Sequence, residues 1–277
     1  MKNRPMTRVN LDKAIGRLAG NDPRLIVDIR MSMANAIVGQ FLPEGVVKGG
    51  TSLKFRFGST AARYTLDLDT ARKSDLDTFL RLFRSNLERG WEGFTGELLI
   101  RPQASPAAMP FDYVMQPCDV KISYMGRSWC TIRLEIGHNE IGDADEAEPT
   151  PIPEDLADCF RTLCFPVPGA VPLMKLSFQI AQKLHGATGR DSRRAHDLID
   201  LQLIFRNAEI SLLDVRKVCE RLFAYRRCQS WPPKVVAGEN WSTIYSTQKR
   251  SLPVLPTVDE AIAWANDLVA RIEKVKE

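Results

Sequence analysis

The sequence predicts an α/β (α+β) protein, in which a lobe with a mixed sheet precedes a mainly helical lobe. In the first half, segments that alternate polar and apolar residues, typical of strands, lie between segments with helical spacing. The second half carries mainly helical spacing. An acidic stretch with three prolines, residues 142–155, connects the two halves. We therefore expect two domains, residues 1–150 and 151–277.

Helices and strands are expected to follow one another in the first half. Asp22-Pro23 marks a break between two helices, and Gly90 marks the end of another. Ser74 and Asp77 resemble a capping box at the start of that helix. The expected helices are 10–20, 24–40 and 74–89, with a further helix opening at 52–57. The expected strands are 63–70, 94–101, 118–125 and 129–136.

The second half is expected to be built from amphipathic helices. Apolar residues recur at helical spacing in residues 173–187, 192–206 and 211–227. Residues 231–256 hold four prolines and two tryptophans, so we expect this segment to wrap the surface. Thr257 with Glu260 forms a capping box that opens the last helix.

Composition excludes several classes of protein. Hydrophobic residues make up 44% and charged residues 26%, which is ordinary globular usage and excludes a disordered or collagen-like chain. The six cysteines include no CxxC pair, and this favours reduced thiols over a disulfide framework. No apolar run reaches the roughly 18 residues of a membrane span. We therefore expect a cytoplasmic protein with no membrane partner.

Basic side chains are concentrated in one part of the chain. The net charge is +4, yet residues 183–250 alone hold 13 basic and 7 acidic side chains. Such a block is typical of a surface that meets polyphosphate or nucleic acid. It is equally typical of solvated helix faces, and the sequence leaves both interpretations open.

The stretch from Lys48 to Asp69 holds candidate residues for binding phosphate and a metal ion. Gly49 and Gly50 allow the backbone to approach a phosphate, and the start of a helix favours an anion there. Thr51 can add a hydroxyl donor. A Gly-Gly turn is otherwise a common structural turn. A role in phosphate binding therefore depends on what lies beside it.

Two aspartates follow on the next expected strand. Asp67 and Asp69 alternate, so both side chains point to one face and can grip the same metal ion. The alternative is a solvated edge strand. Glu135, on a neighbouring strand, has the form of a third carboxylate, although a surface salt bridge to Arg133 is a competing interpretation. Asp119 is a second candidate for that third position. A phosphate cradle beside paired aspartates suits Mg²⁺-assisted phosphoryl or nucleotidyl transfer.

Three ordered motifs, within residues 46–201, resemble one family. Gly49-Gly50-Thr51 with Arg63-x-Thr65-x-Asp67-x-Asp69 resembles the GGT(A)L…R-x-S-x-D-h-D pattern of the AbiEii/AbiGii toxins, which are nucleotidyltransferases of the DNA polymerase β-like superfamily. The other two motifs are Gln179-Ile-Ala-Gln-Lys183-Leu-His185 and Arg194-Ala-His196-Asp197-Leu-Ile-Asp200-Leu. Two positions depart from the pattern: His196 replaces a usual Lys, and Gln182 a common Glu.

The resemblance implies roles for individual residues. It implies a nucleotidyltransferase-fold sheet lobe and a helical lobe that completes the active-site cleft. Mg²⁺ (or Mn²⁺) would be bound by Asp67 and Asp69, with Glu135 as the candidate third ligand. Lys183 would contact a phosphate of the NTP and Asp197 would be the fourth-motif acid. The implied catalytic residues are Asp67, Asp69, Lys183 and Asp197, and the implied nucleotide-binding residues are Gly49, Gly50, Thr51, Arg63 and Lys183. Lys48 is a further candidate for the phosphate role.

Asp197 admits several interpretations. It could anchor Lys183, hold Arg194, or act as a base towards the acceptor hydroxyl. Taken without the resemblance, Asp197 and Asp200 would be surface charges that pair with Arg193 and Arg194.

The resemblance also implies a biological activity. It implies transfer of a nucleoside monophosphate from an NTP to an acceptor, most simply tRNA or another RNA, with release of pyrophosphate. The protein would be the toxin of a type IV, abortive-infection toxin–antitoxin pair with a cognate antitoxin. Two alternatives stay open: a protein-modifying nucleotidyltransferase or phosphotransferase, and a non-catalytic binding module with this fold.

Two further groups of residues were considered as sites. The three histidines, His138, His185 and His196, have no ligand-like spacing with cysteine, so we expect no zinc site. Trp231 and Trp241 could stack on bases or could pin an extended segment onto a core.

Overall fold

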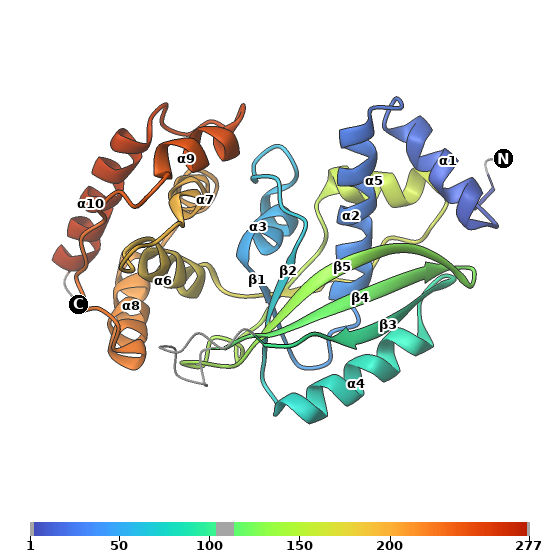
Figure 1. Ribbon diagram of the computed structural model, residues 1–277, viewed down its shortest axis with the longest axis horizontal. Coiled ribbons are helices and arrows are strands. Elements are labelled where there is room, and N and C mark those ends of the chain that lie inside the picture. Colours follow the sequence, from blue (N-terminus) through green and yellow to red (C-terminus); the bar gives the residue numbers. More distant parts are fainter. Residues whose placement is uncertain (1–2, 104–113, 276–277) are drawn as a thin grey trace. The chain divides into compact units, whose positions relative to one another are not determined.

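The computed structural model describes residues 3–103 and 114–275 (Figure 1). Its strands form one mixed sheet in the order β3-β4-β5-β2-β1-β7-β6. The strands are β1 (Gly45–Lys48), β2 (Leu68–Arg72), β3 (Phe94–Ile100), β4 (Gln116–Tyr124), β5 (Arg127–Gly137), β6 (Glu148–Thr150) and β7 (Val171–Leu173). Neighbouring strands are antiparallel except β1–β7 and β2–β5, which are parallel. The predicted mixed α/β class is confirmed.

Helices make up most of the rest of the described chain. The helices of the first part are α1 (Arg8–Leu18), α2 (Pro23–Gly39), α3 (Gly49–Phe57), α4 (Leu76–Arg89) and α5 (Glu154–Thr162). Those of the second part are α6 (Leu176–Ala187), α7 (Ala195–Asn207), α8 (Leu212–Arg226), α9 (Trp241–Lys249) and α10 (Val258–Lys274). No helix in the described ranges is both long and apolar enough to cross a bilayer.

The chain divides into two compact units that interleave in sequence. The first unit holds the sheet and consists of the residues up to Gly58, Thr65–Asn139 and Ala144–Leu173. The second unit is mainly helical and consists of Ser59–Tyr64, Glu140–Asp143 and the residues from Met174 onwards. The sheet extends past residue 150, because β7 joins it beside β1. The functional division into 1–150 and 151–277 stays a prediction.

The sheet has one apolar and one polar face near its centre. On β5, Ile132, Leu134 and Ile136 are buried in the core, and the residues between them are exposed. Leu68 on β2 lies in the same core and is paired with Leu134. Asp69 is paired with Glu135, so both belong to the opposite, polar face. The alternation therefore places carboxylates on the face away from the core.

Local sequence explains where several helices begin. Asp22 caps α2 by accepting from the backbone N–H groups of Arg24 and Leu25, and Pro23 occupies the first turn. The predicted capping box of Thr257 and Glu260 is confirmed at α10. At α4 the predicted box is wrong by one residue: Asp75 is the cap, and its side chain accepts from the N–H of Thr78.

Several predicted elements differ from the structure. The strand expected at 63–70 begins only at Leu68, because Arg63 and Tyr64 leave the sheet to contact Asp200 and Arg250 of the second unit. The expected connection 142–155 contains β6 and the start of α5. Residues 231–256 contain α9 in addition to extended segments.

Candidate active site

Gly49 provides space for the carboxylate of Asp69. Lys48 on β1 is paired in register with Asp69 on β2, and α3 begins at the next residue, Gly49. A Cβ on residue 49 would collide with Oδ2 of Asp69 and lie 3.2 Å from its Cγ. Gly49 also has a φ of +69°, a left-handed conformation that favours glycine. The glycine is therefore required at this position by the aspartate as well as by the turn.

Thr51 connects α3 to the segment that carries Asp67. Its hydroxyl donates to the backbone carbonyl of Asp67 over 2.6 Å, and its side chain is buried. Asp67 directly precedes β2 and is exposed, whereas Asp69 is half-buried on the strand. The structure thus brings Gly49, Thr51, Asp67 and Asp69 together at the start of α3.

These carboxylates suit a cation that is completed by a substrate. Within residues 3–103 and 114–275, no three His, Cys, Asp or Glu side chains are grouped to hold a metal ion, and the role of Glu135 as a third ligand stays a prediction. Mg²⁺ is commonly held by one or two carboxylates together with substrate phosphates and water. Space beside Gly49 is already shaped around a carboxylate. Asp67 and Asp69 therefore fit a divalent ion.

Lys48 is a buried cation in the same row of the sheet. It is 8% exposed, and a Cβ on Gly137 would lie 3.1 Å from its Nζ. Among the residues that the structure describes, it makes no ion pair with a carboxylate. Buried lysines are rare unless paired. This lysine is available to an anionic ligand at the start of α3.

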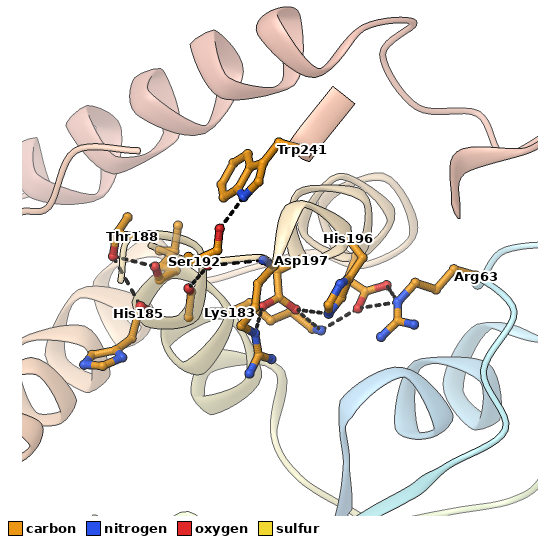
Figure 2. A network of polar contacts seen from close by, with 12 residues as sticks. Arg63, Lys183, His185, Thr188, Ser192, His196, Asp197 and Trp241 are labelled. Atoms are coloured by element: carbon orange, nitrogen blue, oxygen red, sulfur yellow. Dashed lines mark hydrogen bonds and ion pairs between the residues drawn. The ribbon is translucent and has the colours of Figure 1, made fainter. Parts of the chain in front are cut away.

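A second charged cluster lies in the helical unit. Lys183 on α6 is buried, and its Nζ donates to Asp197 over 3.1 Å and to Asp200 over 2.5 Å (Figure 2). Asp197 and Asp200 are three residues apart on α7 and therefore share one face of the helix. Both aspartates are fully buried. The predicted pair Lys183 and Asp197 is thus brought together, with Asp200 as a third member.

Two arginines complete this cluster. Arg194 Nε donates to Asp197 Oδ2 over 2.6 Å, and Arg63 Nε donates to both oxygens of Asp200 over 3.0 and 3.1 Å. Burial alone would raise the pKa of Asp197, but the charges of Arg194 and Lys183 outweigh it and hold that pKa well below the ordinary value. The pKa of Asp200 is likewise lowered, since Arg63 and Lys183 outweigh the effect of burial. Both carboxylates are therefore ionised at neutral pH.

His196, the departure from the family motif, borders the cluster. Its Nε2 lies 3.8 Å from Asp197 Oδ1. Burial, the largest cause, lowers the pKa of His196. The imidazole is therefore neutral at neutral pH and adds no charge.

The two clusters belong to different compact units. Arg63, expected to bind nucleotide, lies with the Lys183 cluster. Gly49, Gly50 and Thr51 lie in the same unit as Asp67 and Asp69. The contact of Asp197 with Arg194, one of the expected alternatives, is present, whereas Asp200 is expected at the surface only when the resemblance is left aside. The three-residue spacing of Asp197 and Asp200 was the available signal. Arg193, the other proposed partner, instead pairs with Glu239.

Comparison with solved structures identifies the fold. MenT4, a nucleotidyltransferase toxin from Mycobacterium tuberculosis H37Rv, aligns with a TM-score of 0.61 at 17% identity, over 96% of this chain and 90% of that chain. Two Helicobacter pylori structures align with TM-scores of 0.45 and 0.44 at 16% identity: a candidate nucleotidyltransferase and JHP933. They cover 88% of this chain and 92% and 89% of theirs. No curated protein sequence matches the chain.

A family model accounts for most of the sequence. The model described as "Nucleotidyl transferase AbiEii toxin, Type IV TA system" matches residues 34–268. This range includes the strands and helices that carry both charged clusters. The expected enzyme class is confirmed with it. The chain belongs to the AbiEii family of nucleotidyltransferase toxins of type IV toxin–antitoxin systems.

Proposed function

We propose that this toxin transfers a nucleoside monophosphate from an NTP to a hydroxyl group of an RNA, with tRNA as the leading candidate. The observation that carries this proposal is the packing of Asp69 against Gly49, with the buried Lys48 in register beside it. A carboxylate, a helix start and an ammonium group that has no carboxylate partner among the described residues lie next to one another, and together they suit a metal-bound triphosphate.

Asp67 and Asp69 would hold the divalent cation. Mg²⁺ or Mn²⁺ bound there would supply charge neutralisation and activation at the α-phosphate. The NTP phosphates would provide further ligands, and Glu135 remains a candidate third protein ligand. Thr51 contributes by fixing the backbone of Asp67 to α3.

The chain's own residues would bind and orient the nucleotide. Lys48 adds a positive charge to the triphosphate, and the first N–H groups of α3, which have no partner inside the helix, favour an anion. The acceptor oxygen then bonds to the α-phosphorus, the bond to the β-phosphate oxygen breaks, and pyrophosphate leaves. The hydroxyl proton passes to solvent.

The buried cluster favours a positioning role for Asp197. Its two oxygens accept from Lys183 and Arg194, its side chain is fully buried, and its pKa is lowered. A carboxylate in this state is a poor general base. Of the three roles considered, anchoring Lys183 and holding Arg194 are therefore favoured. Lys183 retains its proposed role towards an NTP phosphate, but two aspartates already compensate its charge.

Partners follow from the family and from charge. Membership of a type IV toxin–antitoxin family implies an NTP substrate and a cognate antitoxin. The 13 basic against 7 acidic side chains in residues 183–250 support a polyanionic acceptor such as RNA.

A labelling experiment tests the function. The purified protein is incubated with each α-³²P-labelled NTP in turn, total RNA and protein lysate, with and without Mg²⁺. We expect label in RNA with wild type, none with Asp69→Asn, and unchanged labelling with Asp77→Asn, an exposed acid of the same unit. Label confined to protein would overturn the RNA acceptor, and undiminished transfer by folded Asp69→Asn would overturn the metal assignment.

A further inference from the structure

A cavity of about 660 Å³ opens between α8 and α10 in the helical unit, and the proposed NTP chemistry does not use it. Its walls come from the second half of α8, the segment 227–231 and the last turn of α10. The lining includes Phe223, Arg227, Gln229, Trp231 and Glu273. Its size falls within the range of small-ligand sites.

One wall of the cavity is a tryptophan held in a fixed orientation. Trp231 is half-buried, and its ring meets Phe223 edge-on, with 5.4 Å between centroids and 72° between planes. Its Nε1 donates to Glu273 over 2.7 Å. Trp241 differs: it is 1% exposed and donates to Ser192, so it pins the chain to the core (Figure 2). Of these two tryptophans, Trp231 is the one placed to stack on a ligand.

Two glutamates and one arginine carry the charges of the cavity lining. Glu220 accepts from Arg216 over 2.8 Å, and Glu273 lies 3.7 Å from the same guanidinium. Arg227 is exposed, and among residues 3–103 and 114–275 its guanidinium has no carboxylate partner. The cavity lining therefore includes an aromatic ring and, among the described residues, an arginine without a carboxylate partner.

Gln229 adds an amide in a fixed orientation. Its Nε2 donates to the carbonyl of His185 over 2.7 Å and to Oγ1 of Thr188 over 2.6 Å. This pair of bonds anchors the segment 227–231 to α6. The cavity wall is thus preorganised before a ligand arrives, which reduces the entropic cost of binding.

We propose that this cavity binds one unpaired nucleotide of the RNA acceptor, with its base stacked on Trp231 and its phosphate on Arg227. Single-stranded RNA is characteristically recognised by aromatic rings and arginine together. The basic excess of residues 183–250 favours a polyanionic ligand. The aromatic ring favours an RNA strand over an acidic protein segment, because it can stack on a base and offers nothing specific to a carboxylate. This assignment rests on the proposed RNA acceptor and adds a second point of contact to it.

Binding to a fluorescein-labelled 12-nucleotide single-stranded RNA, without NTP, tests the site. We expect Trp231→Ala to raise the dissociation constant about 5- to 100-fold. Trp264→Ala is the matched control, since Trp264 is also a half-buried tryptophan set edge-on to a phenylalanine, Phe205, but does not line the cavity. Equal affinities of wild type and folded Trp231→Ala would overturn the proposal. Trp231→Phe keeps a stacking ring and guards against a folding defect. Its dissociation constant should stay within about threefold of the wild-type value.

Arg227 is tested through the salt dependence of the same binding. Arg227→Asn keeps a residue that tolerates the left-handed φ of +54° and removes the charge. It should reduce the slope of log Kd against log salt by about one, whereas Arg24→Asn, an exposed arginine of the other unit, should not. An unchanged slope for Arg227→Asn would overturn the proposed contact of Arg227 with a phosphate.

Cys228 provides a measurement that needs no variant. It is exposed and lines the cavity, so its alkylation by iodoacetamide can be followed by mass spectrometry. The 12-nucleotide RNA should slow that alkylation, and ATP at the same nucleotide concentration should not. Protection by ATP alone, or by neither, would overturn the RNA assignment; protection by purified antitoxin but not by RNA would reassign the cavity to the protein partner.

The two proposals can fail separately. If wild type labels RNA but Trp231→Ala binds RNA normally, only the cavity assignment fails. If no RNA is labelled while binding still depends on Trp231, the acceptor proposal fails and the nucleotide site stands.

Discussion

The carboxylate of Asp69 occupies the volume that a side chain on Gly49 would need. A glycine of the phosphate-binding turn and an aspartate of the cation site are therefore one packing unit. Neither can be exchanged without consequences for the other.

Gly49→Ala should abolish NMP transfer. The added methyl group would displace the Asp69 carboxylate, and the left-handed φ would cost about 1–2 kcal/mol of stability. Gly126→Ala is the control, because Gly126 has a φ of +72° but no atom within 4 Å of a built Cβ. Urea unfolding should show a similar loss in the free energy of unfolding for both variants. NMP transfer should be lost in Gly49→Ala and kept in Gly126→Ala. Full transfer by Gly49→Ala would contradict the packing argument.

Lys48→Met should lower NTP affinity without destabilising the protein. A charge-assisted contact is worth about 1.5–3 kcal/mol, so the dissociation constant for the NTP should rise about 10- to 100-fold. Binding of the matching nucleoside, which has no phosphates, should be unchanged. The free energy of unfolding should equal or exceed that of wild type, because the variant removes a buried charge that has no carboxylate partner among the described residues. Lys73→Met, an exposed lysine of the same unit, is the control.

Lys183→Ala should destabilise the protein and raise the apparent KM for NTP. Its removal leaves Asp197 and Asp200 buried with less compensation, which costs about 3–5 kcal/mol. Lys234→Ala, which removes an exposed lysine, should change stability little. Urea unfolding measures the first effect and initial rates at varied NTP the second. Wild-type stability in Lys183→Ala would contradict the buried ion-pair network.

His185 should make the protein less stable in acid. Burial, with the nearby charges of Arg226 and Arg194, lowers the pKa of His185 to about 4. An unfolded histidine titrates near pH 6.5, so between about pH 6.5 and 4 the unfolded chain binds a proton that the folded chain does not. The free energy of unfolding should therefore fall, on the order of 3 kcal/mol, as the pH drops through this window.

His185→Gln isolates this contribution. The variant should show a smaller loss of stability between pH 7.5 and 4 than wild type, measured by urea unfolding at each pH. Identical pH profiles for the two proteins would show that another group is responsible.

Local chemistry accounts for the elements that the sequence predicted. Asp22-Pro23 and Thr257 with Glu260 define helix starts through contacts within four residues, and both form. β6 and β7 were missed because each has three residues, too few to show a period, and because β7 is held by pairing with a strand more than a hundred residues away. α9 begins after Asn240, whose side chain makes no capping bond.

The candidate site was predictable where residues are close in sequence. The one-residue separation of Asp67 and Asp69 predicts a shared face, and the structure places Asp67 directly before β2 and Asp69 on it. The partners of Lys183 are harder to predict, because apart from the resemblance nothing local indicates that α7 turns Asp200 to α6 and to Arg63. The contact of Asp69 with Gly49 likewise depends on the pairing of β1 with β2.

Two short segments, Ser59–Tyr64 and Glu140–Asp143, belong to the helical unit although the chain before and after each of them belongs to the sheet unit. Arg63 from the first segment meets Asp200, and Glu140 from the second grips Arg226 through contacts of 2.7 to 3.0 Å. A gene fragment that starts at residue 151 would encode the helices but omit these counter-ions. Recombination that replaces only the 3′ part of the gene would separate the helices from the residues that pair with their charges. The two parts of the gene are therefore expected to be inherited together.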